Sequence, residues 1–234
     1  AGVGRALRVH QAADQAGAKV VLLGDAKQRA AIEAGAAFRA VTERVGATEI
    51  TEIRRQREDW ARGASREFAR GDVATGLDAY RQRGHVRQVE SREAAKAALA
   101  ADWLADRQAG KSSIILAHSN KDVTSINESI RTARTAAGEL GPGADYRTER
   151  GTRNFAAGDR LVFLENSQAL GVKNGTLGTV EAAEAGRLLV KLDGGAQVQV
   201  DQDHYGKLDH GYAVTIHKAQ CVTVDRAHVL ATPG

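Results

Sequence analysis

The stretch Ser113-Ile114-Ile115-Leu116-Ala117 is an uninterrupted apolar run of strand length, which is typical of a buried strand. A helical pattern follows over residues 121–137, with Asn120 as its expected N-cap. A second apolar run covers residues 212–216. Short strands that alternate with helices of ten or more residues predict an α/β domain with a mostly parallel sheet.

The same alternation continues on both sides of this unit. Ser91 is placed to cap an alanine-rich helix that reaches Gln108, and the apolar run at 19–23 ends in Gly24-Asp25, like a strand that enters a loop. The expected strands of the α/β part are 19–23, 48–53, 86–89, 113–117, 212–216 and 227–230. The expected helices are 30–45, 59–69, 72–81, 92–108 and 121–137.

The rhythm of the sequence changes after Gly141-Pro142-Gly143, which is the clearest internal boundary. Beyond it, short apolar segments are separated by turn signals such as Lys173-Asn174-Gly175 and Asp193-Gly194-Gly195. This pattern predicts a small all-β module, which we expect to be a barrel inserted into the α/β sheet. Its expected strands are 159–164, 178–181, 187–192 and 197–200.

Composition narrows the class of protein. The 234 residues carry a formal net charge of +4, with 42% hydrophobic and 26% charged residues, as in ordinary globular domains. A single cysteine, Cys221, excludes an internal disulfide framework and a cysteine-rich zinc site. No apolar run is long enough for a membrane span. Because the sequence shows neither a signal peptide nor a disulfide framework, we expect a cytoplasmic protein. The sequence holds no methionine, from which we expect a piece of a longer protein.

Several common catalytic motifs are missing from the sequence. There is no G-x-x-x-x-G-K-[ST] phosphate loop and no G-x-G-x-x-G after a strand. The seven histidines lack the spacing of metal ligands, and no G-x-S-x-G motif occurs. We therefore expect no metal site, no hydrolase triad and no dinucleotide redox chemistry.

Three polar motifs follow predicted strands, which is where α/β proteins bind ligands. The first, Gly24-Asp25-Ala26-Lys27-Gln28, can sense a phosphate or order a metal-bound water, and a plain strand-to-helix turn is the alternative. The second, Arg54-Arg55-Gln56, suits a nucleotide phosphate, and solvated charges are the alternative. The third, Thr215-Ile216-His217-Lys218-Ala219-Gln220, is densest in groups that can bind a nucleic-acid backbone, and a solvated loop is the alternative.

In this order, the three motifs resemble those of superfamily 1 DNA helicases of the RecD-like branch. Longer strings are similar to the helicase region of Ti-type conjugative relaxases, so that the resemblance covers nearly the whole chain. These strings are 34–40, 51–60, 155–160, 171–180 and 209–234.

The resemblance implies a fold and a division into domains. The implied fold is α/β, with RecA-like P-loop NTPase helicase domains, each a parallel sheet with flanking helices, and an inserted SH3-like small β-barrel. The first RecA-like domain would contribute its C-terminal part, residues 1–47. The second would comprise residues 48–144 and 208–234, and the barrel would comprise residues 145–207.

The resemblance also implies roles for single residues. Gly24, Asp25 and Gln28 would lie at the nucleotide, and Arg55 would reach its γ-phosphate from the second domain. The implied cofactors are ATP and Mg²⁺ in the longer protein, with none bound tightly by this chain. Single-stranded DNA is the implied partner, and proteins of the conjugation machinery are further ones. The expected DNA contacts are Asn174, Thr215, His217, Lys218 and Gln220.

The chain also departs from the family pattern. The P-loop, the Walker B acids and the motif VI arginine do not occur in it, and Cys221 stands where the family has glycine. We therefore expect part of an ATP-driven DNA helicase, translocating 5′ to 3′, whose 234 residues alone do not hydrolyse ATP. A binding module for single-stranded nucleic acid or protein, without catalysis, is one alternative. A degenerate NTPase-like scaffold is the other.

Overall fold

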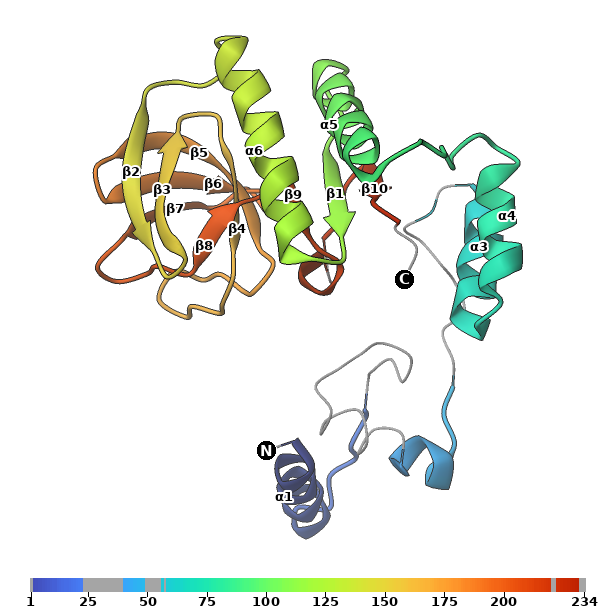
Figure 1. Cartoon of the computed structure of the whole chain (residues 1–234). Coiled ribbons are helices and arrows are strands. Elements are labelled where there is room, and N and C mark those ends of the chain that lie inside the picture. The colour runs from blue at the N-terminus through green and yellow to red at the C-terminus, as the bar shows by residue number, and fades with distance from the viewer. Residues whose placement is uncertain (1, 23–39, 49–55, 57, 220–221, 232–234) are drawn as a thin grey trace. The chain divides into compact units, whose positions relative to one another are not determined.

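The computed structural model describes residues 2–22, 40–48, 56, 58–219 and 222–231. It divides into two compact units, residues 1–87 and 88–234, each of which is described by itself (Figure 1). The first unit holds α1 (Gly2–Gln15), α3 (Asp59–Arg70) and α4 (Val73–Arg81), and residues 40–45 are also helical. Across the described ranges, every helix falls short of the length and apolar character that a bilayer crossing needs.

Helices α3 and α4 form a hairpin within the first unit. Gly71 ends α3 with a φ of 87°, and the Asp72 carboxylate caps α4 by accepting the Thr75 backbone N–H at 3.1 Å. Trp60 of α3 meets Tyr80 of α4 edge-on, with ring centroids 5.0 Å apart. Both helices confirm the sequence prediction, because the glycine and the capping carboxylate are local signals.

The second unit contains a parallel three-stranded sheet in the order β10-β1-β9. Ser91 caps α5 through the Ala94 N–H at 3.1 Å, as the sequence predicts. The strands of this sheet are β1 (Ser113–Ala117), β9 (Ala213–Thr215) and β10 (Arg226–Val229). Its helices are α5 (Arg92–Gln108) and α6 (Asn120–Ala136). Strands and long helices in this order confirm an α/β arrangement for this part of the chain.

Between α6 and β9 the chain forms an all-β module. Five antiparallel strands lie in the order β7-β6-β5-β4-β8, beside the antiparallel hairpin β2–β3. All of them contribute to one apolar core, which includes Tyr146, Phe155 and Phe163. The strand pairs of the described residues make an open sheet and a hairpin, and no closed barrel is found among them. The strands are β2 (Gly143–Thr148), β3 (Gly151–Ala156), β4 (Arg160–Phe163), β5 (Leu177–Glu184), β6 (Arg187–Leu192), β7 (Gln197–Asp201) and β8 (Leu208–His210).

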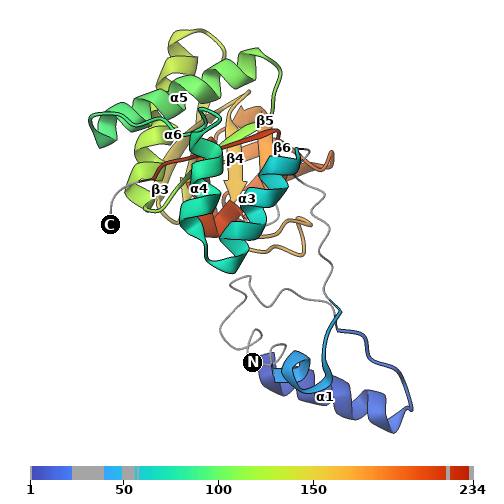
Figure 2. The same cartoon turned by 90° about the vertical axis from the view of Figure 1, so that its right-hand side faces the viewer.

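The two faces of the parallel sheet are covered by different elements. Ile115 of β1 belongs to the core that Trp103 of α5 and Ile126 of α6 complete, so both helices cover one face (Figures 1 and 2). Its neighbour Ile114 points to the opposite face, because successive strand residues alternate. There it packs in a cluster with Val162 of β4. The all-β module therefore packs against the second face of the sheet.

A buried polar network joins α6 to the residues that precede β4 and β9. Asp159 is fully buried and accepts hydrogen bonds from Arg131 Nε at 3.0 Å and from the Tyr212 hydroxyl. Arg134 is also fully buried, and its Nη1 donates to the Gly158 carbonyl at 2.8 Å and to the Tyr212 hydroxyl at 3.1 Å. Because buried charges are stable only when paired, the network holds the module in one position on α6.

Some predicted elements are wrong. Residues 19–22 and 86–89 are irregular, because no described strand supplies hydrogen-bond partners to them, and Val21 is 69% exposed. Ser119, and not Asn120, caps α6, since its Oγ accepts the Asp122 N–H at 3.1 Å.

Other differences concern strands that the sequence analysis did not predict and predicted elements that lie outside the described residues. Strands β2, β3 and β8 are absent from the prediction, because they are short and hold too few apolar residues to show a clear alternation. The predicted strand at 48–53 lies almost entirely outside the described residues, as does the first part of the predicted helix at 30–45.

Candidate nucleic-acid interface

The segment that follows β9 carries most of the predicted DNA contacts. Strand β9 pairs in parallel with β1 and leads into the 3₁₀ helix η1 (Ile216–Ala219). Thr215, the last residue of β9, is only 8% exposed, whereas His217 is exposed and Lys218 is half-buried. The chain thus passes from core to surface within two residues, and η1 presents an imidazole and an ammonium group at the carboxyl end of the sheet.

Asn127 of α6 fixes the start of β9. Its side-chain Nδ2 donates to the carbonyls of His210 at 3.1 Å and Ala213 at 3.2 Å. Its Oδ1 accepts the Ala213 N–H at 2.7 Å. One buried amide therefore satisfies three backbone groups and sets where β9, and with it η1, begins. Sequence reasoning missed Asn127, because a single asparagine inside a helix carries no local signal of its partner.

Two arginines of the β2–β3 hairpin lie at Asp209 of β8. Arg153 Nε donates to Asp209 Oδ1 at 3.2 Å, and Arg150 Nη1 lies 3.7 Å from Asp209 Oδ2. Burial, and then the positive charge of Arg150, lower the pKa of Lys218, while the nearby Asp209 carboxylate opposes them. The hairpin and η1 therefore share one electrostatic neighbourhood, which the predicted site did not include.

Asn174 is the remaining predicted DNA contact within the described residues. It lies on the connection between β4 and β5, where it is exposed, and its backbone N–H donates to Asn166 Oδ1 at 2.8 Å. The structure thus shows that the turn at Asn174 is held by a side chain of the same connection. Its predicted DNA contact stays a prediction.

The predicted nucleotide site falls outside the described residues. The same is true of the last residue of the third motif and of the cysteine after it. These residues are Gly24, Asp25, Gln28, Arg55, Gln220 and Cys221. Their roles stay predictions. In the part of the chain that is described, no three His, Cys, Asp or Glu side chains gather in a way that could hold a metal ion.

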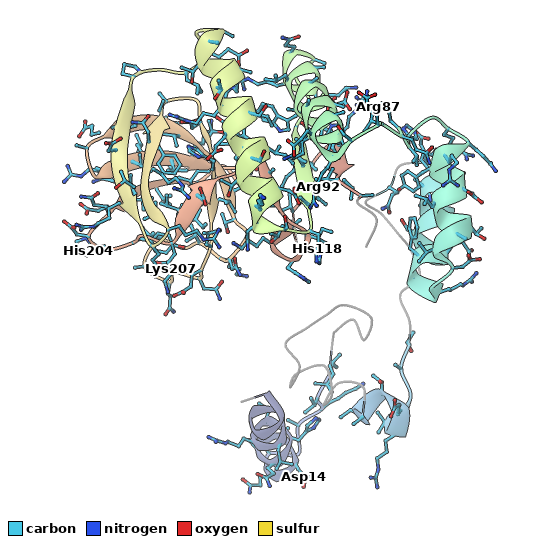
Figure 3. All side chains as sticks on the ribbon, viewed as in Figure 1. Asp14, Arg87, Arg92, His118, His204 and Lys207 are labelled. Carbon is cyan, nitrogen blue, oxygen red and sulfur yellow. The ribbon has the colours of Figure 1, made fainter. Side chains whose placement is uncertain are left out.

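A charged cluster lies at the N-terminal ends of α5 and α6. Arg92 donates to both carboxylate oxygens of Asp122, from Nε at 2.9 Å and from Nη2 at 2.5 Å, and Lys96 Nζ lies 3.1 Å from Ser125 Oγ. The Arg92 guanidinium lowers the pKa of Asp122. His118, which follows β1, is exposed (Figure 3). This cluster ties the two helices together, since its charges are mutually paired.

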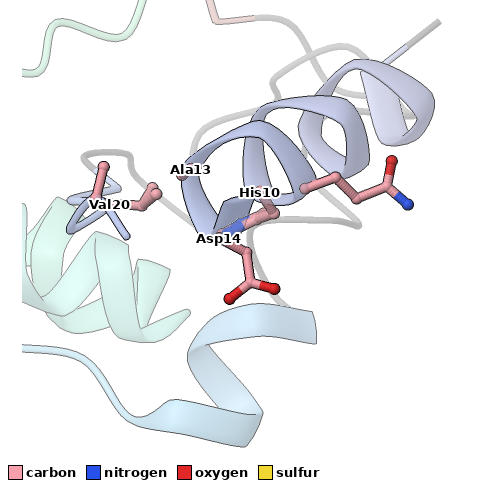
Figure 4. A pocket seen from close by; sticks show the side chains of 6 residues that line it. His10, Ala13, Asp14 and Val20 are labelled. Atoms are coloured by element: carbon pink, nitrogen blue, oxygen red, sulfur yellow. The ribbon is translucent and has the colours of Figure 1, made fainter. Parts of the chain in front are cut away.

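A pocket of about 390 Å³ lies along α1 in the first unit (Figure 4). Its lining comes from α1 and the segment after it, namely His10, Gln11, Ala13, Asp14, Ala18 and Val20. His10 and Asp14 are its only titratable side chains, and neither corresponds to a predicted site residue.

Comparisons with known proteins identify relatives of the chain. Residues 1–91 match a protein family described as an AAA domain. The conjugal transfer protein TraA of Rhizobium radiobacter is 46% identical over 221 residues, which are 93% of this chain and 20% of that protein. The chain is homologous to one segment of TraA. TraA of Agrobacterium fabrum is 45% identical over 221 residues, with the same shares. The chain spans about a fifth of the length of the curated relatives it matches.

A solved structure agrees on the fold. The Pif1 helicase from Bacteroides, crystallised with ADP-AlF3 and ssDNA, is 21% identical, with a TM-score of 0.50 over 78% of this chain and 45% of that one. This likeness supports a RecA-like helicase fold with a parallel sheet and helices. The TraA relatives confirm the resemblance to conjugative transfer proteins that the sequence strings indicated.

Proposed function

We propose that the chain is the helicase part of a conjugative transfer protein, an ATP-driven translocase on single-stranded DNA that works in the cytoplasm. The observation that carries this proposal is the 46% identity with TraA over 93% of the chain. The likeness to a Pif1 helicase is consistent with it at the level of fold. We further propose that translocation runs 5′ to 3′ and that proteins of the conjugation machinery recruit the longer protein.

The proposed domains are those that the sequence predicts. Residues 1–47 would complete a first RecA-like domain, and residues 48–144 with 208–234 would form the second. Residues 145–207 would be an insertion of SH3-like type. The shared core of β1, β4 and β9 supports this nested order, because the chain leaves the parallel sheet, builds the module and returns to β9.

The proposed nucleotide site would use residues from both RecA-like domains. Gly24, Asp25 and Gln28 would contact ATP from the first domain, and Arg55 would stabilise charge on its γ-phosphate from the second. ATP hydrolysis with Mg²⁺ would supply the free energy of translocation in the longer protein. The phosphate loop that cradles the nucleotide is missing from these 234 residues, so we expect no hydrolysis by the chain alone.

The proposed DNA contact lies on η1. Thr215 and His217 would contact the DNA backbone, with Lys218 and Gln220 beside them and Asn174 in a turn near the DNA strand. The supporting observation is that Asn127 holds the buried strand β9, so that the exposed His217 just after it is presented from a fixed position. Backbone contacts of this kind bind without strong sequence preference.

The first test measures binding of the purified 234-residue chain to fluorescent oligo(dT) by anisotropy, with ATPase activity followed in parallel. We expect weak binding with a log–log salt slope of about −2 to −3, and no ATP turnover. Lys218→Gln is expected to weaken binding about threefold, because one phosphate contact is lost. Lys111→Gln is the matched control, since Lys111 is an exposed lysine at the opposite end of β1.

Three results would contradict the proposal. Turnover of ATP that depends on Arg55 would show that the chain holds a complete nucleotide site. Equal affinities of the Lys218→Gln and Lys111→Gln variants would remove η1 from the interface. DNA binding that survives both His217→Ala and Lys218→Gln would favour the alternative, a non-catalytic nucleic-acid module in the β strands.

A further inference from the structure

The tip of the β2–β3 hairpin is a rigidly built turn. Thr148 is 6% exposed, its Oγ1 donates to the Gly151 carbonyl at 2.6 Å, and the same Oγ1 accepts the Arg150 N–H at 3.2 Å. The Glu149 N–H donates to the Gly206 carbonyl at 2.9 Å, which ties the tip to the segment before β8. The hairpin therefore presents Arg150 from a fixed backbone.

The guanidinium groups of this hairpin are only partly satisfied by the protein. Arg153 gives one hydrogen bond, from Nε to Asp209, and Arg150 stands 3.7 Å from the same carboxylate, beyond hydrogen-bond distance. In the described part of the chain, Asp209 is the only carboxylate that pairs with either arginine. Because a guanidinium has five N–H donors, most donors of both groups are open to an anion.

The acids nearest to the tip are already engaged elsewhere. Lys207 stands just before β8 (Figure 3), lies 3.5 Å from Glu149 and also pairs with Glu165. Asp209 is thus the one acid shared by Arg150, Arg153 and the neighbourhood of Lys218. Two guanidinium groups on one carboxylate leave a positive excess, which attracts a polyanion.

We propose that Arg150 and Arg153 bind backbone phosphates of single-stranded DNA and extend the η1 contact onto the β2–β3 hairpin. Asp209 then acts as an internal counter-ion, which orients both guanidinium groups and competes with the phosphates for them. This inference rests on the proposed function, because the ligand is the same DNA strand.

The experiment compares double variants of the full 234-residue chain in the oligo(dT) anisotropy assay across salt concentrations. Arg150→Gln with Arg153→Gln is expected to lower affinity about tenfold and to reduce the magnitude of the salt slope by about 1.4, or 0.7 for each lost contact. The control is Arg147→Gln with Arg187→Gln, which removes the same charge from two exposed, acid-paired arginines of the module. We expect it to change affinity less than about twofold.

A second variant tests the counter-ion. Asp209→Asn keeps an Oδ1 that can accept the His210 N–H, which Asp209 accepts at 2.9 Å, but removes the negative charge. We expect this variant to bind oligo(dT) about threefold more tightly, because the phosphates no longer compete with a carboxylate. A mere structural role for Asp209 predicts the opposite sign. Circular dichroism and thermal melting show whether each variant is folded. If the arginine double variant unfolds, the affinity of the Asp209→Asn variant decides whether the two arginines bind DNA.

The outcomes separate the two proposals. If Lys218→Gln weakens binding but the Arg150→Gln with Arg153→Gln variant matches its control, the proposed contact of Arg150 and Arg153 with DNA is wrong. The proposed contact at η1 then remains. If Asp209→Asn weakens binding while the protein stays folded, the counter-ion role is wrong. If the wild-type chain binds no single-stranded DNA at all, the proposed DNA contacts at η1 and at Arg150 and Arg153 are both wrong.

Discussion

At the scale of single residues, His210 at the end of β8 is the clearest titratable group in the core of the all-β module. It is 9% exposed, and its Nε2 lies 3.1 Å from the Asn154 carbonyl, so the neutral ring donates from that nitrogen. Burial lowers the pKa of His210, and Arg131 adds to this effect, while Asp159, Asp209 and the bond to Asn154 oppose it. The folded protein therefore favours the neutral ring.

This residue predicts a loss of stability on mild acidification. The folded-state pKa lies below the ordinary value of 6.5, so its contribution is complete above that value and is lost as the pH falls through the folded pKa. We expect the free energy of unfolding in urea to fall between about pH 7 and pH 5. His210→Gln should flatten this part of the profile, because glutamine does not titrate. A variant with the wild-type slope would exclude His210 as the cause.

At the scale of secondary-structure elements, the α3–α4 hairpin depends on one glycine and tolerates another. Gly71 ends α3 at a φ of 87°, a conformation that residues with a Cβ adopt only with strain. Gly63 lies inside α3, and a Cβ added there would meet no atom within 4 Å. The same substitution should therefore have opposite effects at these two positions.

Gly71→Ala is expected to destabilise the hairpin by about 1–2 kcal/mol, because the Cβ of alanine is strained in the left-handed backbone conformation. Gly63→Ala is expected to stabilise it by up to about 1 kcal/mol, because alanine loses less backbone entropy in a helix. Hydrogen–deuterium exchange of the α3 and α4 amides measures both changes directly. Protection that rises in both variants would mean that Gly71 is not required for the turn.

At the scale of the whole second unit, the buried network of Asp159, Arg131 and Tyr212 connects the all-β module to the α/β sheet. The apolar cluster around Ile114 and Val162 makes the same connection on the other side of β1. Apolar packing alone allows a range of angles between the module and the sheet, whereas hydrogen bonds between charged groups require one relative orientation. The network therefore sets the position of the β2–β3 hairpin beside η1, on which the proposed DNA surface depends.

Asp159→Asn is expected to destabilise the protein by about 3–5 kcal/mol, because Arg131 loses a buried partner. Asp193→Asn is the matched control. The Asp193 side chain is 45% exposed in its ion pair with Arg160, and its loss should cost less than about 1 kcal/mol. Urea unfolding followed by circular dichroism compares the two variants. Similar unfolding midpoints for both variants would show that the buried network contributes little to the stability of the contact between the all-β module and the sheet.

The sequence alone determined the elements whose signals are local. The apolar run of β1, the serine before α5 and the glycine after α3 each act on neighbouring residues, so their patterns predicted these elements correctly. The motif order also indicated a resemblance to conjugative transfer proteins, and TraA is 46% identical over 93% of the chain. The sequence did not predict strands β2, β3 and β8, because a strand with few apolar residues is stabilised by its partner across the sheet rather than by its own pattern.

Only the tertiary structure decided how the candidate DNA surface is built. Arg150, Asp209 and Lys218 come from three segments of the chain, and no spacing in the sequence relates them. Asn127 likewise acts on β9 from a helix more than eighty residues earlier. Electrostatic and hydrogen-bond partners depend on distance in space, which the hairpin register and the packing of the module on the sheet determine. The arrangement of these charges is therefore a property of the fold and not of any local pattern.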